Sequence, residues 1–152
     1  MHVRTLIVSG AAAVVGVALW PVPGDTQSPP RSTWSGVYSP AQAERGLELY
    51  LATCSQCHGP DMTGIDTAPP LTGGRFAANW NGVTLGEMVE RIRKSMPQNN
   101  PGSLSRAEIA DVTAYILQQN GFPAGESELP RQTAFLRTIA YEAYAPAGQE
   151  GK

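Results

Sequence analysis

The stretch Cys54-Ser55-Gln56-Cys57-His58 decides how the rest of the chain is interpreted. Two thiols separated by two residues, with a histidine directly after the second, form the C-x-x-C-H pattern of covalent haem attachment. In this pattern each thiol forms a thioether bond to one haem vinyl group, and the histidine presents its imidazole to the iron. The sequence contains no other cysteine, so the pattern predicts one c-type haem per chain.

Three other chemistries use a similar pair of cysteines. A disulfide between Cys54 and Cys57 would close a small, strained ring that stabilises little, although exported chains do use disulfides. A thioredoxin-like redox pair expects a βαβ surrounding, whereas the sequence here is helix-like before the pair and rich in glycine and proline after it. Structural zinc needs four ligands, and the only other histidine is His2. The residues favour haem but leave these alternatives open.

The first 24 residues have the features of an export signal. His2 and Arg4 give a weakly basic start, and an apolar run from Leu6 to Leu19 follows. As a helix this run would span about 21 Å, which is short for a bilayer core of about 30 Å. A signal peptide cleaved after Gly24 is therefore favoured, and an uncleaved N-terminal anchor is the alternative. Covalent haem is normally attached after export, so we expect a periplasmic protein.

The charge balance argues against two classes of partner. The chain carries 11 basic and 13 acidic side chains, for a formal net charge of -2. Loss of residues 1–24 removes Arg4 and no acidic residue, which leaves a net charge of about −3. That charge is too small for strong electrostatic steering, and no basic run suggests nucleic acid. Contact with a membrane is expected only if the N-terminal segment is retained.

Three serine or threonine caps predict where helices begin. Residues 25–38 are rich in proline, serine, threonine and glycine and are expected to be a flexible lead-in. Regular structure is expected from Ser39, because Ser39-Pro40-Ala41-Gln42 has the form of a capping box. The same box occurs at Thr84-Leu85-Gly86-Glu87 and at Ser105-Arg106-Ala107-Glu108. The first predicted helix runs directly into the cysteine pair.

Two further stretches complete the expected organisation. Glycine and proline recur after His58 and predict a loop of about 25 residues, a length that is uncommon unless functional. A haem packed against this loop would supply the missing core. Residues 128–144 are expected to hold a fourth helix, and no alternating strand pattern is found. The apolar side chains of that helix would be Phe135, Leu136 and Ile139.

The chain resembles a class I mono-haem c-type cytochrome over roughly residues 40–121. The resemblance rests on the helix leading into CSQCHG, on Ala68-Pro69-Pro70-Leu71, on Ser95-Met96-Pro97 and on a helix ending in Ala-Tyr-Ile-Leu. It implies an all-α cytochrome c fold, with three to five helices and long loops packed around one covalently bound haem. The expected segments are a signal peptide or anchor at 1–24, the lead-in at 25–38, the cytochrome domain at 39–121 and a C-terminal extension with a helix at 122–152.

The resemblance also assigns roles around the cysteine pair. Cys54 and Cys57 would bind the haem covalently. His58 would bind the iron through Nε2, while its other nitrogen donates to the carbonyl of Pro69 and so fixes the ring. Leu71 would pack on the proximal face of the haem.

Five more residues have expected positions. Trp80, through its indole N–H, and Arg75, through its guanidinium, are candidate partners of the haem propionates. Both residue types are more often ordinary surface or core residues. Gly46 and Tyr50 would cross the helix of Tyr115, where small residues allow close approach.

Four methionines are available as the second iron ligand. Met1 is excluded by position, and Met62 follows His58 so closely that it would have to reach round the haem plane. Met88 fits the apolar stripe of its helix and is expected in the core. Met96 lies 38 residues after His58, where a capped helix gives way to a proline-containing loop. The resemblance implies that Met96 is the distal ligand.

Ligation by histidine and methionine leaves no open coordination position, and the thioether raises the reduction potential. We therefore expect a single-electron carrier rather than an enzyme, relaying electrons from a dehydrogenase to the respiratory chain. The stretch from Met96 to Pro130 resembles cytochromes that accept electrons from dehydrogenases, including quinoprotein dehydrogenases. The expected partners are thus a redox protein donor and acceptor. The alternative is a haem subunit of an enzyme or a gas-binding sensor with an open distal site.

Overall fold

The structure, a computed structural model, describes residues 31–147 and is mainly helical there. The export segment predicted at residues 1–24 lies outside the described residues. The expected all-α fold class is confirmed, and two of the six helices in the described part are single turns. The elements are β1 (Arg31–Ser32), η1 (a 3-10 turn, Thr33–Ser35), α1 (Pro40–Thr53), α2 (Ser55–His58), α3 (Gly73–Trp80), α4 (Leu85–Ser95), α5 (Arg106–Gln119), α6 (Thr133–Leu136) and β2 (Ile139–Ala140).

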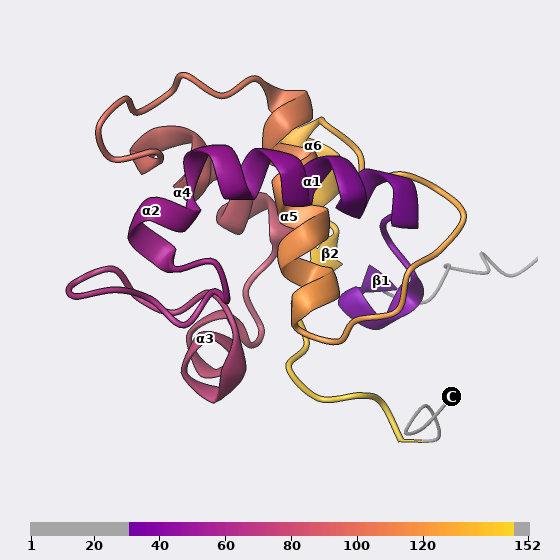
Figure 1. Ribbon diagram of the computed structural model, residues 1–152. Coiled ribbons are helices and arrows are strands. Elements are labelled where there is room, and N and C mark those ends of the chain that lie inside the picture. Colours follow the sequence, from indigo (N-terminus) through magenta and orange to yellow (C-terminus); the bar gives the residue numbers. More distant parts are fainter. Residues whose placement is uncertain (1–30, 148–152) are drawn as a thin grey trace, which may run out of the picture.

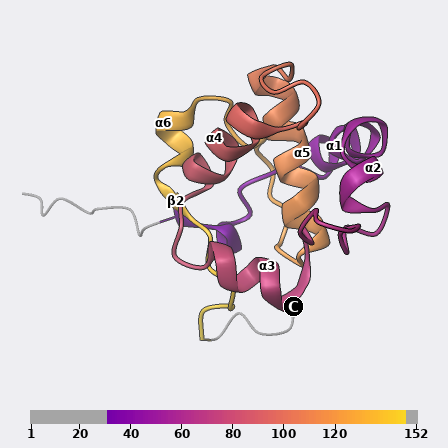
Figure 2. The same ribbon diagram turned by 90° about the vertical axis from the view of Figure 1, so that its left-hand side faces the viewer.

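Helix α5 forms the centre of the fold, with α1 and α2 on one side and α4 and α6 on the other (Figure 1, Figure 2). Helix α1 crosses α5 at Gly46, where an added Cβ would overlap the backbone carbonyl of Asp111 and the Cβ of Tyr115. Beside this crossing the ring centroids of Tyr50 and Tyr115 lie 5.5 Å apart. The expected crossing is therefore confirmed, and it fixes the end of α1 that leads into the cysteine pair.

The three predicted caps begin α1, α4 and α5. The Thr84–Glu87 and Ser105–Glu108 pairs close reciprocal capping boxes. At α1, Ser39 accepts a hydrogen bond from the backbone N–H of Gln42. The Gln42 side chain is buried, however, and exchanges two hydrogen bonds with the backbone of Leu129. The box expected at Ser39 is only half formed, because a tertiary partner takes the glutamine amide.

Residues 31–38 belong to the folded domain, so the expectation of a flexible lead-in is wrong for this part. Val37 and Tyr38 are each 1% exposed, and the Tyr38 hydroxyl donates to the carbonyl of Phe122 at 2.7 Å. The ring of Trp34 packs edge-on against Phe122, with 4.9 Å between centroids. Burial of these apolar side chains offsets the conformational entropy lost when this segment is ordered, although its polar composition suggested a linker.

The long loop expected after His58 is interrupted by α3, so that expectation is wrong for residues 73–80. This helix begins with two glycines, and its N-cap Thr72 makes no side-chain capping hydrogen bond, so no local signal marks its start. Phe76 and Trp80 lie one turn apart, with 6.1 Å between ring centroids. Burial of Phe76 stabilises this helix instead of capping.

The fourth helix expected within residues 128–144 is also mostly absent. Only α6 forms, and Phe135, expected on its apolar face, is 62% exposed. Ile139 lies in β2 instead, where it pairs with Arg31 in a parallel two-stranded sheet. The backbone beyond α6 pairs with β1 and with Val83 and Thr84, and this pairing replaces the helix. The extension nevertheless contributes to the core through the buried side chains of Leu129, Leu136, Ile139 and Tyr141.

Candidate functional site

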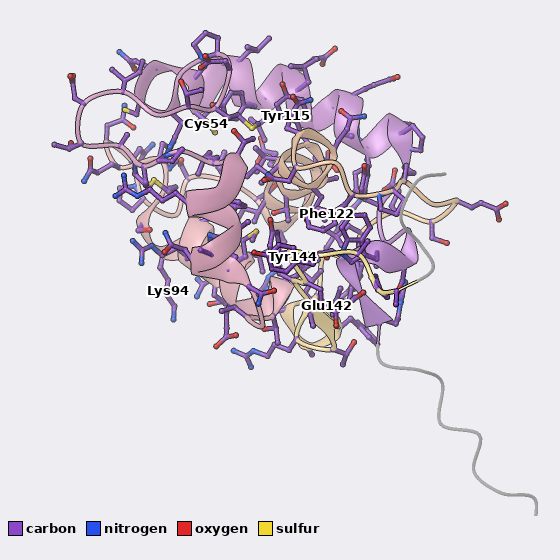
Figure 3. The ribbon with its side chains drawn as sticks, turned by 90° about the horizontal axis from the view of Figure 1, so that it is seen from below. Cys54, Lys94, Tyr115, Phe122, Glu142 and Tyr144 are labelled. Atoms are coloured by element: carbon purple, nitrogen blue, oxygen red, sulfur yellow. The ribbon has the colours of Figure 1, made fainter. Side chains whose placement is uncertain are left out.

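The cysteine pair and His58 are held on one short turn between α1 and the loop that follows. The Cys54 N–H donates to the carbonyl of Tyr50 at 2.8 Å and ends α1. The Cys54 carbonyl then accepts from the N–H groups of Cys57 (3.1 Å) and His58 (3.0 Å), which begins α2. Cys54 lies beside α1 at the upper edge of Figure 3. The two thiols and the imidazole therefore project from one hydrogen-bonded turn of backbone, which fixes their spacing.

The two thiols have different surroundings. Both are free in the structure. Cys54 is partly buried against the core, and burial, together with the nearby Cys57, raises the pKa of its thiol to about 11. Cys57 is exposed. One thiol thus faces the protein interior and the other faces solvent.

The imidazole of His58 is oriented by the protein backbone. His58 is 7% exposed, and its Nδ1 lies 2.8 Å from the carbonyl oxygen of Pro69. A carbonyl oxygen can only accept a hydrogen bond, so Nδ1 carries a proton, and in the neutral ring this tautomer places the lone pair on Nε2. The contact expected between these two residues is present, and it leaves the His58 nitrogen that a metal ion would need.

The loop that returns Pro69 to His58 depends on a glycine that the sequence reasoning missed. Gly64 has φ +82°, and an added Cβ would overlap the carbonyl of Ala68. Its N–H donates to the His58 carbonyl at 2.9 Å, and the Ile65 N–H donates to the Cys57 carbonyl at 3.1 Å. The loop is thus tied to the same turn that carries the imidazole.

Two further polar side chains anchor this region through hydrogen bonds that the sequence did not indicate. The Tyr50 hydroxyl donates to the carbonyl of Gly59, and burial raises the pKa of Tyr50, so it stays a donor. Asn120, at the end of α5, donates from Nδ2 to the carbonyl of Leu71 at 2.9 Å. Leu71, the residue expected on the proximal face, is half-buried against the core. In the sequence Asn120 is recognisable only as a residue that ends a helix, and this does not indicate that its side chain binds the Leu71 carbonyl.

The three described methionines differ in burial. Met62 and Met88 are 1% and 2% exposed and belong to the core, which confirms the expected place of Met88. Met96 is half-buried and caps the C-terminus of α4, where its N–H donates to the carbonyl of Ile92 at 2.8 Å. Of these thioethers, only that of Met96 lies outside the core cluster. Its role as an iron ligand stays a prediction.

The two candidate propionate partners lie together on α3. Trp80 is partly buried against Phe76, and Arg75 is exposed. The haem contacts expected of Trp80 and Arg75 stay predictions. Within residues 31–147 no three histidine, cysteine, aspartate or glutamate side chains gather as a metal site. No helix of this part of the chain is long and apolar enough to cross a membrane.

The chemistry of these groups fits a covalently attached haem. The turn at 54–58 offers two free thiols and one imidazole whose Nδ1 is bound to a backbone carbonyl, which leaves Nε2 for a ligand. Helix α4 ends in a thioether that the core does not bury. Thiols for the vinyl groups and a nitrogen and a sulfur for the iron are the donors that a c-type haem takes.

Comparison with known proteins agrees with this chemistry. The model of the family described as cytochrome c oxidase, cbb3-type, subunit III matches residues 41–116, half of the chain. The chain is 27% identical over 109 residues to a cytochrome c of Dictyostelium discoideum, covering 55% of this chain and 96% of that protein. It is 33% identical over 79 residues to a thiosulfate dehydrogenase of Stutzerimonas stutzeri (strain A1501), covering 47% of this chain. The match spans only 25% of that dehydrogenase.

A solved structure was also compared with this fold. The sulfane dehydrogenase SoxCD from Paracoccus pantotrophus aligns with 83% of this chain and 68% of its own chain, at 20% identity and a TM-score of 0.47. The family match over residues 41–116 is the finding that identifies the chain. The chain therefore belongs to the cytochrome c family of the cbb3-type subunit III model, and it is an electron-transfer haem protein.

Proposed function

We propose that this chain is a periplasmic single-electron carrier with one covalently attached haem c, bound to the iron through His58 and Met96. The observation that carries the proposal is the buried His58 ring, whose Nδ1 is bound by the Pro69 carbonyl at 2.8 Å. A histidine held in this way presents Nε2 in one tautomer and one orientation. Cys54 and Cys57, on the same turn, would form the two thioether bonds.

The residues of the site would each contribute to electron transfer. The bound haem supplies an iron that accepts and releases one electron. The Pro69 carbonyl raises the basicity of the His58 imidazole, and the thioether of Met96 favours the ferrous state. Because His58 is fixed by the turn at 54–58 and by the loop of Gly64, it keeps its position in both oxidation states.

We further propose that the electron donor is a dehydrogenase and that the acceptor belongs to the respiratory chain. The similarity to part of a thiosulfate dehydrogenase makes a dehydrogenase of inorganic sulfur compounds the first donor to test, with a quinoprotein dehydrogenase as the second. Apolar side chains near the haem motif, including Leu51 (50% exposed) and Ile65 (44% exposed), would form the contact. Such electron-transfer contacts are usually small and transient.

Three measurements test the proposal. Haem staining after denaturing electrophoresis should label the wild type and not the Cys54→Ser/Cys57→Ser double variant, because only covalent haem survives denaturation. The ferric spectrum should contain a Met–iron charge-transfer band that Met96→Ala abolishes. A five-coordinate, high-spin wild type would contradict the carrier and favour an open distal site. Fractionation of the native cell should place the haem-stained chain in the periplasm, and co-purification there should identify the donor.

A further inference from the structure

The C-terminal segment 122–141 lies beyond the part of the chain that the family model matches, yet it is built into the core. Its side chains Leu129, Leu136, Ile139 and Tyr141 are each 1% exposed. The segment crosses from α1 to α4 and contacts the two helices at different points. These two ends make different kinds of contact.

At one end the segment is attached to α1. Gln42 donates from Nε2 to the carbonyl of Leu129 at 3.2 Å and accepts from the Leu129 N–H at 2.6 Å. Arg45 pairs with Glu128 at 2.7 Å and with Asp111 of α5 at 3.0 Å. These contacts join the segment to the α1–α5 crossing, and none of them involves α4.

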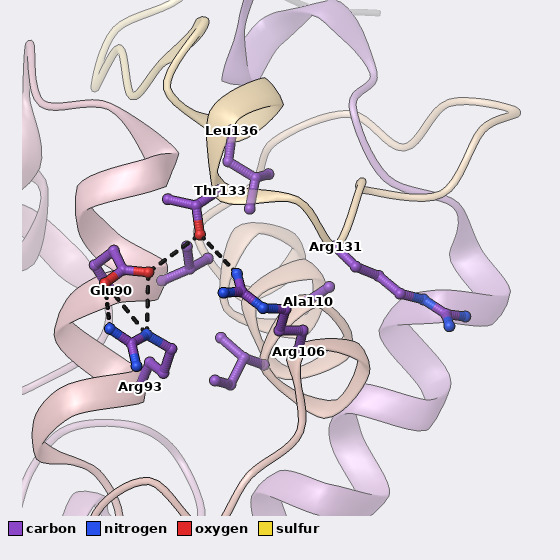
Figure 4. Close-up of a pocket in the computed structure, with 9 residues that line it drawn as sticks. Glu90, Arg93, Arg106, Ala110, Arg131, Thr133 and Leu136 are labelled. Carbon is purple, nitrogen blue, oxygen red and sulfur yellow. Dashed lines mark hydrogen bonds and ion pairs between the residues drawn. The ribbon is translucent and has the colours of Figure 1, made fainter.

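At the other end one hydroxyl group connects three helices. Thr133, the first residue of α6, donates from Oγ1 to Glu90 of α4 at 3.1 Å and accepts from Arg106 of α5 at 3.1 Å. Figure 4 shows Thr133 between these two side chains. Glu90 also pairs with Arg93 at 2.8 Å. The bond from Arg93, followed by that from Thr133, lowers the pKa of Glu90 to about 2, so the carboxylate remains an acceptor at neutral pH.

The first turn of α4 is held by the backbone of the same segment. Gly86 is buried, and an added Cβ would overlap the side-chain Cγ of Arg137 and lie 2.9 Å from its backbone N and 3.0 Å from its Cα. Just before the helix, Tyr141 exchanges two hydrogen bonds of 2.8 Å, one with the Val83 carbonyl and one with the Gly82 N–H. The C-terminal segment therefore contacts α4 along its first turn as well as at Glu90.

Met96 lies at the far end of this helix. Met96 follows Gly86 by ten positions, which is a rise of about 15 Å along an α-helix, so the two ends of α4 move together. After Met96 the chain enters a loop without regular structure that continues to Ser105. The position of Met96 is therefore set chiefly by how α4 sits on its neighbours.

From these contacts we propose that residues 133–141 are a brace that positions α4, and through it Met96, for binding the iron. The proposal rests on the His58/Met96 ligation proposed above. In it Thr133, Gly86 and Arg137 are positioning residues that do not touch the haem. The α1 end of the same segment, at Gln42 and Leu129, stabilises the fold without setting Met96.

The test uses the purified holo-cytochrome and measures imidazole binding to the ferric iron, in which imidazole competes with Met96. Gly86→Ala overlaps the Arg137 side chain and crowds its backbone N and Cα, which shifts α4 away from Arg137, and we expect imidazole to bind about tenfold more tightly, equivalent to 1.4 kcal/mol. Thr133→Val removes the hydroxyl but keeps the backbone, and we expect imidazole to bind about threefold more tightly. In both variants the Met–iron charge-transfer band should weaken in proportion.

Two control variants separate positioning from general stability. Gly74→Ala makes the same substitution on α3, where an added Cβ meets nothing within 4 Å, and it should bind imidazole as the wild type does. Gln42→Leu breaks the α1 end and should lower the urea midpoint measured by circular dichroism, with imidazole binding unchanged.

Each outcome decides the proposal. Wild-type imidazole affinity in both Gly86→Ala and Thr133→Val overturns it, and Thr133→Val alone decides if Gly86→Ala does not fold. An equal gain of affinity in Gln42→Leu also overturns it, since loss of stability would then explain the effect. A wild type without the charge-transfer band defeats the His58/Met96 ligation itself, which distinguishes failure of the proposed function from failure of the brace.

Discussion

Substitution of Gly46 by alanine tests the crossing on which the position of the haem motif depends. Helix α1 approaches α5 so closely at this point that a Cβ would overlap the Asp111 carbonyl carbon and oxygen and the Cβ of Tyr115. The obstacles are backbone atoms and the stem of a buried aromatic residue, none of which can rotate away. The two helices must therefore separate or slide to admit a single methyl group.

The size of the effect follows from two opposing contributions. Overpacking a well-packed contact costs about 1–3 kcal/mol, and rigid obstacles place Gly46→Ala at the upper end, near 3 kcal/mol. Alanine is a better helix former than glycine and returns up to about 1 kcal/mol. We therefore expect the free energy of unfolding to fall by about 2 kcal/mol.

Urea denaturation of the holo-protein, followed by far-ultraviolet circular dichroism, measures this change. Gly74→Ala is the matched control, because it places the same methyl group on a helix with no atom within 4 Å, and it should be neutral or slightly stabilising. If Gly46→Ala unfolds at the same urea concentration as Gly74→Ala, the close approach of α1 and α5 is not the contact described here.

Three other variants make further predictions. Gln42→Leu leaves the N–H and carbonyl of Leu129 unpaired in the core and should lower the free energy of unfolding by about 2–4 kcal/mol, whereas Gln118→Leu, exposed on α5, should unfold with the wild type; equal urea midpoints would contradict this. Gly64→Ala places a Cβ at a positive φ and against the Ala68 carbonyl. It should lower the free energy of unfolding more than Gly82→Ala, at a position with φ +80° and no neighbour within 4 Å. Equal losses of stability would show that only backbone strain matters. The pKa of Glu90 is lowered to about 2 from an ordinary value of 4.5, so its ionised carboxylate contributes stability above pH 4.5 that is lost as the pH falls towards 2. Glu90→Gln should therefore be less stable than the wild type at pH 7 and equally stable near pH 2. A constant difference in stability across an acid titration would refute the assignment.

The helices that could be predicted from sequence are those with local start signals. The boxes at Thr84 and Ser105 are formed by side chains three residues apart, so the sequence alone contains both partners. Ser39 begins α1 as predicted, but Gln42 finds its partner at Leu129, which is 87 residues away. The helix of Phe76 starts with two glycines and no capping bond. Its stability comes from tertiary burial, which no local pattern records.

The candidate site divides in a similar way. The pentapeptide identifies its own chemistry, because the thiols and the imidazole are neighbours in the chain. The contact between His58 and Pro69 followed from the resemblance, since nothing in the residues between them specifies it. The supports at Gly64 and Asn120 were missed, because a glycine in a loop and an asparagine after a helix each have many ordinary explanations. Their roles become visible only in the fold, where the Ala68 carbonyl leaves no room for a Cβ at Gly64 and the Leu71 carbonyl accepts a hydrogen bond from Asn120.

The pairing of β1 with β2 has a consequence for how the domain can be tethered. Arg31 pairs with Ile139 and Ser32 with Ala140, so the chain enters the folded domain beside the strand with which the extension ends. In both ribbon views this pair lies on the opposite side of α5 from α2 (Figure 1, Figure 2). An anchor or fused domain joined ahead of Arg31 would therefore be attached at the edge remote from Cys54–His58, and it would leave the motif side of the domain uncovered at the point of attachment.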